Sequence, residues 1–141
     1  MLLDAYAAGL IDGEGCLGIY NSHPNKRWFH IQLKVALVQP DEQVLYDLQD
    51  RWGGSVYRII SRDIKHQPQT VWCLTDHQAL NTCLDELKPF LRIKQDQAGV
   101  LQYYIQNLVG KAGRVLSDET IKKRRVCYEA TRFLNQRGSI E

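Results

Sequence analysis

Long apolar runs, paired cysteines and low-complexity segments are all missing from this chain of 141 residues. No apolar stretch approaches the ~20 residues that a membrane-spanning helix needs. The start of the chain also lacks the basic region and apolar core of a signal peptide. The four cysteines are scattered and form no CxxC motif, which argues against a zinc site. We therefore expect free thiols and an intracellular rather than secreted protein, in the cytoplasm or nucleoid of a prokaryote or in an organelle.

The remaining composition is that of an ordinary globular domain. Hydrophobic residues make up 44% of the chain and charged residues 24%. With no break in composition and no internal repeat, we expect a single domain over residues 1–141. The net charge of +2 and the isoelectric point near 8.3 allow nucleic-acid binding without requiring it. A local absence says more: no Asp or Glu occurs between positions 16 and 40.

The clearest strand in the sequence covers residues 28–39. Apolar and polar side chains alternate along it, which is typical of a strand with one buried and one solvated face. The apolar face consists of Phe29, Ile31, Leu33, Val35 and Leu37, and the polar face of His30, Gln32, Lys34 and Ala36. This alternation predicts an antiparallel sheet.

Apolar spacing, capping residues and Gly or Pro breaks predict the other elements. The predicted helices cover about 3–12, 41–52, 77–87, 94–109 and 117–135, and the predicted strands 16–22, 28–39, 55–62 and 69–75. Asp76 and Ser117 are expected to cap the helices that follow them. In the last strand, Trp72 and Leu74 should point inward, and Val71 and Cys73 outward. The order α-β-β-α-β-β-α with two trailing helices predicts an α+β fold, in which helices cover one face of an antiparallel sheet.

The segment from Ala7 to Gly15 has two unusual features, small residues within a helix and acidic residues at its end. Small residues such as Ala8 and Gly9 let a helix approach a second helix closely. The helix then ends in Asp12-Gly13-Glu14-Gly15. A carboxylate at a helix C-terminus is disfavoured by the helix dipole, so a bound cation would explain it. Carboxylate and carbonyl oxygens are the ligands that Mg²⁺ prefers.

This segment resembles the LAGLIDADG motif. It matches the motif at Ala8, Gly9, Leu10, Ile11, Asp12 and Gly15 and departs from it at Ala7, Gly13 and Glu14. Only the last departure concerns chemistry, and there Glu keeps the charge of the motif's second Asp.

Two further segments resemble the same family. Gln39-Pro40-Asp41 resembles its Gln-Lys-Asp segment, and Leu87 to Gln95 resembles its Pro-Phe-Leu-basic-x-Lys-Gln segment. The resemblance covers a core module of about 3–110, and the last helix, about 117–135, is less diagnostic. Because the chain carries a single copy of the motif, the resemblance implies a homodimer with the first helices packed on a two-fold axis.

The resemblance implies a site-specific homing endonuclease, the product of a mobile element that is intron-encoded or free-standing. Such an enzyme hydrolyses both strands of a long pseudo-palindromic DNA target and leaves short 3′ overhangs. Glu14, Gln39 and Lys94 would be catalytic: Gln39 would position the attacking water, and Lys94 would stabilise charge on the phosphate. The Glu14 carboxylate and Gly13 carbonyl would bind Mg²⁺, for which Mn²⁺ is expected to substitute. The implied dimer interface consists of Ala8, Gly9, Ile11 and Asp12.

Candidate DNA-binding residues follow from the polar strand face and the neighbouring turns. They are Tyr20, Ser22, Lys26, Arg27, His30, Gln32, Lys34, Arg58 and Arg62. Side chains of these kinds read base edges in the major groove. At about 3.3 Å per residue, the strand 28–39 is roughly 40 Å long. One subunit would then cover about 10–12 base pairs and a dimer about 20–24.

Three other functions fit parts of the same sequence. One is an RNA-binding maturase that assists intron splicing on the same scaffold. A second is a DNA-binding protein that no longer cuts, although such a protein need not keep Glu14, Gln39 and Lys94. The third is a small α+β interaction module whose polar strand face is only its solvated side. Cleavage that requires a metal distinguishes the nuclease from all three.

Overall fold

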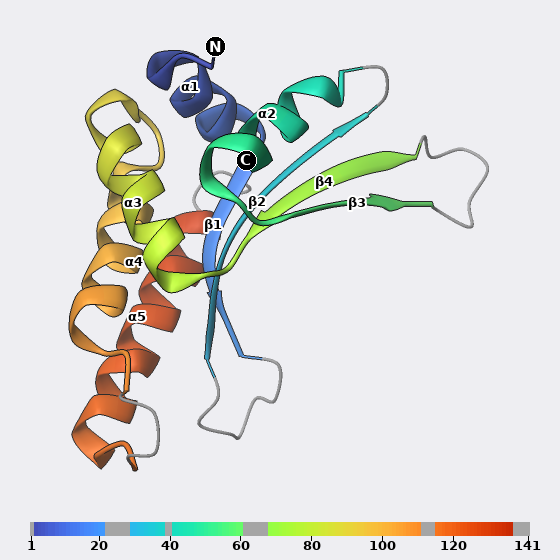
Figure 1. The fold of residues 1–141 in the computed structure, drawn as a ribbon. Helices are drawn as coiled ribbons and strands as arrows, with labels where there is room; N and C mark the ends of the chain where they lie inside the picture. The colour runs from blue at the N-terminus through green and yellow to red at the C-terminus, as the bar shows by residue number, and fades with distance from the viewer. Residues whose placement is uncertain (1, 22–28, 39–40, 61–67, 111–114, 137–141) are drawn as a thin grey trace.

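The computed structural model of the chain describes residues 2–21, 29–38, 41–60, 68–110 and 115–136. Within these ranges the strands form a four-stranded antiparallel sheet, and the helices pack on one of its faces (Figure 1). The predicted α+β class, with one antiparallel sheet covered on one face, is confirmed.

The elements follow the predicted order, with a short 3₁₀ helix before α4. The helices are α1 (Asp4–Glu14), α2 (Gln43–Trp52), α3 (His77–Leu87), η1 (Lys88–Phe90), α4 (Gln95–Asn107) and α5 (Asp118–Gln136), and the strands are β1 (Gly15–Tyr20), β2 (His30–Val38), β3 (Ser55–Ile59) and β4 (Gln69–Leu74). In the described part of the chain, none of the helices is long and apolar enough to cross a membrane.

The strand order in the sheet is β1-β2-β4-β3, so β2 and β4 lie in the middle. Leu33 of β2 pairs with Leu17 on one side and with Leu74 on the other. The outer edge of β1 is covered by α5, where Asn135 Nδ2 donates to the Leu17 carbonyl at 2.9 Å. Covering an edge strand in this way removes a free row of backbone groups that could otherwise pair with another chain.

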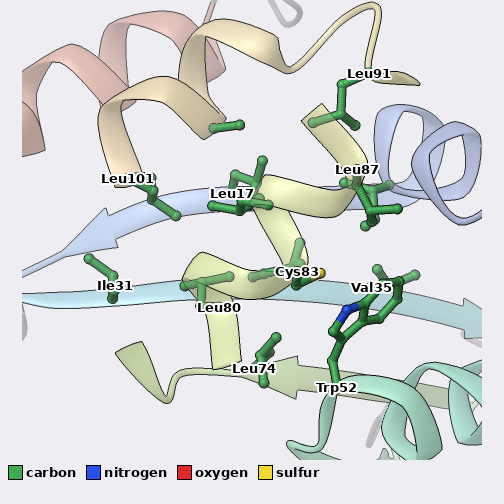
Figure 2. Packing of buried hydrophobic residues seen from close by; sticks show 14 of the residues in the cluster. Leu17, Ile31, Val35, Trp52, Leu74, Leu80, Cys83, Leu87, Leu91 and Leu101 are labelled. Carbon is green, nitrogen blue, oxygen red and sulfur yellow. The ribbon is translucent and has the colours of Figure 1, made fainter. Parts of the chain in front are cut away.

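The hydrophobic core lies between the helices and the covered face of the sheet. Figure 2 shows strand residues Leu17, Ile31, Val35 and Leu74 beside helix residues Trp52, Leu80, Cys83, Leu87 and Leu101. Leu17, Leu33 and Trp72 are completely buried on this side. Burying a large apolar side chain contributes about 1.5–3 kcal/mol. This layer therefore supplies most of the stability of the sheet, including that of its opposite face, which the helices leave uncovered.

Both predicted helix caps are confirmed. The Asp76 carboxylate accepts from the Ala79 N–H at 2.9 Å, and the Ser117 hydroxyl accepts from the Thr120 N–H at 3.1 Å. The first helix differs from its prediction, because it includes Gly13 and Glu14 and ends only where β1 begins. The predicted helix 94–109 is shorter at both ends, from Gln95 to Asn107.

Candidate active site and nucleic-acid interface

The end of α1 runs directly into the sheet, without a linking residue between Glu14 and Gly15. A Cβ atom on residue 15 would lie 2.7 Å from the main-chain oxygen of Ile11, closer than real Cβ atoms come. Only glycine fits this close approach between the last helical turn and the first strand residue. The exposed residues Gly13 and Glu14 are therefore held where the helix meets the sheet.

Lys94 reaches the same end of α1 from a distant part of the chain. Its Nζ donates a hydrogen bond of 2.6 Å to the main-chain oxygen of Asp12, one of the last carbonyls, which a helix leaves without an internal partner. The positive charge also offsets the negative end of the helix dipole. Two of the predicted catalytic residues, Glu14 and Lys94, thus lie at one helix end. The third, Gln39, lies outside the described residues.

The chemistry of this helix end suits a hard cation. In the described part of the chain, the Glu14 carboxylate has no hydrogen-bond or ion-pair partner. The Gly13 carbonyl belongs to the last turn of α1. Both kinds of oxygen are ligands that Mg²⁺ accepts. No cluster of three or more His, Cys, Asp or Glu side chains suited to a metal occurs among the described residues. The Glu14 carboxylate and the Gly13 carbonyl therefore suit a metal ion, because both are oxygen ligands and both residues are exposed.

The open face of the sheet, on the side away from the helices, carries polar and small side chains. The pairing register places Tyr20 opposite His30, and Gly18 opposite Gln32. A row across all four strands consists of Cys16, Lys34, Cys73 and Ser55. The four predicted face residues Tyr20, His30, Gln32 and Lys34 therefore share this face. No acidic side chain lies on it within the described strands, so the face offers donors without carboxylates that would repel an anion.

Two thiols hold polar groups on the open face. The Tyr20 hydroxyl lies 3.3 Å from Cys16 Sγ, and Gln32 Nε2 donates to Cys73 Sγ at 3.2 Å. Burial, and next the hydrogen bond with Cys16, raise the pKa of Tyr20, so its hydroxyl stays protonated and remains a donor. The Gln32 side chain keeps its carbonyl oxygen and one amide hydrogen for another partner.

The chain is similar to known proteins in structure but not in overall sequence. No protein-family model matches the chain, and no curated protein matches it significantly. Several solved structures, by contrast, match the chain over most of its length. The homing endonuclease I-CvuI, in complex with the I-CreI target in the presence of 2 mM Mg and with the DNA not cleaved, is 20% identical, with a TM-score of 0.59 over 91% of this chain and 93% of its own. The homing endonuclease I-TnaI is 17% identical, with a TM-score of 0.69 over 96% of this chain and 97% of its own.

A longer structure matches through part of its length. The LAGLIDADG meganuclease I-AabMI, bound to uncleaved DNA, is 19% identical, with a TM-score of 0.68 over 90% of this chain and 44% of its own. The chain has the LAGLIDADG homing-endonuclease fold. At these identities the likeness concerns the fold, and the roles of individual residues rest on the geometry of this chain.

Within this LAGLIDADG fold, the predicted dimer interface on α1 needs correction. Ala8 and Ile11 are completely buried in the core of their own chain, and Asp12 is only 8% exposed. They cannot offer a surface to a second subunit, so the prediction is wrong for these residues. Gly9 is exposed, and a Cβ atom on it would meet nothing within 4 Å. The outward side of α1 consists of Ala5, Tyr6, Gly9 and Gly13, with Leu10 at its border.

Arg58 was predicted on the open face, and that placement is also wrong. Arg58 pairs with Thr70 across β3 and β4, and Thr70 is fully buried on the helix side of the sheet. The guanidinium instead forms an ion pair of 3.1 Å with Glu42, just before α2. Its strand neighbour Tyr57 takes the place on the open face that the prediction gave to Arg58.

Several other residues of the open face were not predicted from the sequence. They are Cys16, Ser55, Tyr57, Ile59 and Gln69, whereas Cys73 points outward as predicted. The alternation in β1 could have revealed Cys16, because it falls on the side of Tyr20 and opposite to the apolar Leu17 and Ile19. Val71 shares this face, as predicted, but it is 2% exposed rather than solvated. The predicted DNA contacts Ser22, Lys26, Arg27 and Arg62 lie outside the described residues.

Proposed function

We propose that the chain is one subunit of a homodimeric LAGLIDADG homing endonuclease, which cuts both strands of a long pseudo-palindromic DNA target and leaves short 3′ overhangs. The observation that carries the proposal is the presence of Glu14 and Lys94 at one end of α1, where this helix meets the sheet. An exposed carboxylate there would only weaken simple DNA binding, because it repels phosphate. The fold shared with I-CvuI and I-AabMI, both solved with DNA, supports the same function.

The open face of the sheet is the proposed DNA surface. Lys34 and Gln32 have the donors that recognise guanine and adenine edges in the major groove, and Tyr20 adds a protonated hydroxyl. A twisted antiparallel ribbon fits this groove. Because the described strands place no carboxylate on the face, phosphates on either side of the groove would meet no repulsion from it.

Glu14 and Gly13 are the residues that would hold a divalent metal ion, Mg²⁺ or in its place Mn²⁺. When bound, such an ion supplies an activated water and charge stabilisation for the leaving 3′ oxygen. Lys94 lies at the same helix end and would stabilise negative charge on the scissile phosphate. Gln39 is assigned to orient the attacking water on the sequence resemblance alone.

The outward side of α1 is the proposed dimer interface. Gly9 leaves open space on this side, and Tyr6 is 57% exposed. An open hollow next to them is lined in part by Leu3, Val44 and Phe90. Burying these apolar groups against a second copy would remove them from water. A chain that matches 44% of I-AabMI would need a second copy to reach the same size.

Cleavage of a randomised plasmid library tests the proposed activity. With Mg²⁺, we expect double-strand cuts at a single kind of site, about 22 base pairs long, and no cuts without a metal. Glu14→Gln should abolish cutting because the metal loses its carboxylate ligand. Glu129→Gln is the matched control, since it removes one negative charge from an exposed position on α5 and should cut normally.

Two results of this experiment, and two of parallel binding measurements with duplex DNA and structured RNA, would contradict the nuclease. Failure of the folded protein to cut with any divalent metal would do so, as would normal cutting by Glu14→Gln. DNA binding without cutting would favour the cleavage-inactive alternative. Preferential binding of structured intron RNA over duplex DNA would favour the maturase.

A glycine substitution tests the dimer separately. Gly9→Leu should give a folded monomer, because the new side chain meets open space within its own chain but would separate two α1 helices. Gly99→Leu is the control, since Gly99 is a helical glycine of α4 whose added Cβ would meet only the tip of Lys88, at 3.6 Å. Sedimentation equilibrium should show a dimer for wild type and Gly99→Leu. A dimeric Gly9→Leu would exclude this interface.

A further inference from the structure

Asp12 is bound to the segment before α4 through four hydrogen bonds. Its carboxylate accepts from the main-chain N–H groups of Arg92 at 2.7 Å, Ile93 at 3.2 Å and Lys94 at 3.0 Å. Its main-chain oxygen accepts from Lys94 Nζ at 2.6 Å. Both the backbone and the side chain of Lys94 are thus fixed by one residue of α1.

The surroundings of Asp12 make this connection rigid. The residue is only 8% exposed, and hydrogen bonds to an ionised group in such a site are stronger than those between neutral groups. The Lys94 side chain does not cap α4. The three hydrogen bonds that the Asp12 carboxylate accepts therefore hold the backbone in place where this helix begins. Glu14 follows Asp12 by two residues on the same helix end. One residue therefore links the backbone of α1, which carries Glu14, to Lys94.

We propose that Asp12 is a positioning residue, which holds the Lys94 ammonium at the end of α1 where the scissile phosphate would lie. This inference rests on the proposed nuclease function, but it adds a role that the motif resemblance did not suggest. Asp12 was expected at the dimer interface, and the structure turns its carboxylate inward toward α4 instead. It touches neither substrate nor metal in this role and acts through Lys94.

A double-mutant cycle separates positioning from a general structural role. Single-turnover cleavage of pre-bound DNA is measured for wild type, Asp12→Ala, Lys94→Met and the double variant. If Asp12 acts through Lys94, Asp12→Ala slows cleavage on the order of 10- to 100-fold when Lys94 is present, as misplacement of a catalytic group does. In the Lys94→Met background the same change should alter the rate by less than about twofold, because the group it positions is gone.

Two further variants keep the experiment decisive. Asp12→Asn keeps the shape and one acceptor oxygen, so it should recover much of the rate that Asp12→Ala loses. If Asp12→Ala does not fold, the smaller rate loss of Asp12→Asn must still disappear in the Lys94→Met background. Asp4→Ala is the matched control: Asp4 is also an acid of α1, but it pairs with Arg51 rather than with the α4 segment. It should lower stability without any coupling to Lys94.

A readout without cleavage distinguishes failure of this inference from failure of the proposed function. Amide hydrogen exchange at Arg92, Ile93 and Lys94 should be slow in wild type and fast in Asp12→Ala, while Asp4→Ala leaves it slow. Unchanged exchange, or rate losses from Asp12→Ala and Lys94→Met that multiply, would overturn the positioning role. If wild type cuts no DNA at all, the proposed function fails, and the exchange data still decide whether Asp12 holds Lys94.

Discussion

The two faces of the sheet use the same four strands for different purposes. On the covered face, Leu17, Leu33 and Trp72 are fully buried under the helices. On the open face, Lys34 and Gln32 stand beside two thiols and no carboxylate in the described strands. Successive strand residues point to opposite faces, so that Leu33 packs in the core whereas its neighbour Lys34 lies on the open face. If the open face binds DNA as proposed, stability and DNA binding can be changed separately by substituting adjacent residues.

The largest expected effect comes from the covered face. Leu33→Ala removes a fully buried side chain in a central strand and should lower the free energy of unfolding by about 2–5 kcal/mol. Equilibrium urea denaturation at a fixed protein concentration measures this loss. A change below about 1 kcal/mol, the average for any substitution, would mean that the sheet is not packed as described.

The adjacent substitution should act on DNA instead. Lys34→Ala is expected to change the free energy of unfolding by no more than about 0.5 kcal/mol, but to weaken binding of the cognate duplex by about 1–3 kcal/mol through loss of a base contact. Fluorescence anisotropy at constant salt measures the affinity. Lys122→Ala, at an exposed position on α5, is the control, and equal losses from the two variants would refute a specific role for Lys34.

The smallest expected effect tests the register of β3. Tyr57→Ala should weaken DNA binding more than Arg58→Ala, because Tyr57 lies on the open face and Arg58 on the covered one. Arg58 is 56% exposed and paired with Glu42, so its loss should cost at most about 1 kcal/mol of stability. The same anisotropy and urea measurements apply. If Arg58→Ala weakened DNA binding more than Tyr57→Ala, then Arg58, and not Tyr57, would lie on the open face, and the described register of β3 would be wrong.

Local patterns in the sequence were enough to predict the elements but not their partners. The alternation around Leu33 and the caps at Asp76 and Ser117 depend on neighbours in the chain, and all of these predictions are confirmed. The side on which Arg58 lies depends on how β3 is aligned with β4 after the Gly53–Gly54 turn, where both φ angles are positive. A strand of only five residues has too few alternating positions for the sequence to show which of its sides faces the core.

The errors on α1 have a similar physical origin. An apolar stripe such as Ala8 and Ile11 can pack against its own domain or against a second subunit, since burial is favourable in both cases. Asp12 binds a segment far away in the sequence, and no local pattern reports a contact of that kind. By contrast, Glu14 and Lys94 were named from motif resemblance. The structure brings both to one helix end, and their catalytic roles stay a prediction.

Thiol labelling in the presence of DNA tests most directly the central claim that the open face binds DNA. Cys16 and Cys73 lie partly exposed on this face, whereas Cys83 and Cys127 are buried. Burial raises the pKa of Cys83 to about 12 and also raises that of Cys127, and a thiol that stays protonated reacts slowly with iodoacetamide. The two buried thiols therefore serve as internal references in peptide mass spectrometry.

The duplex is first selected for binding from a random pool in Ca²⁺, so that the measurement does not depend on cleavage. Saturating amounts of this duplex should slow the alkylation of Cys16 and Cys73 together and leave that of Cys83 and Cys127 unchanged. Alkylation of Cys16 and Cys73 in the saturated complex at the rate of the free protein would contradict the assignment of the open face to DNA.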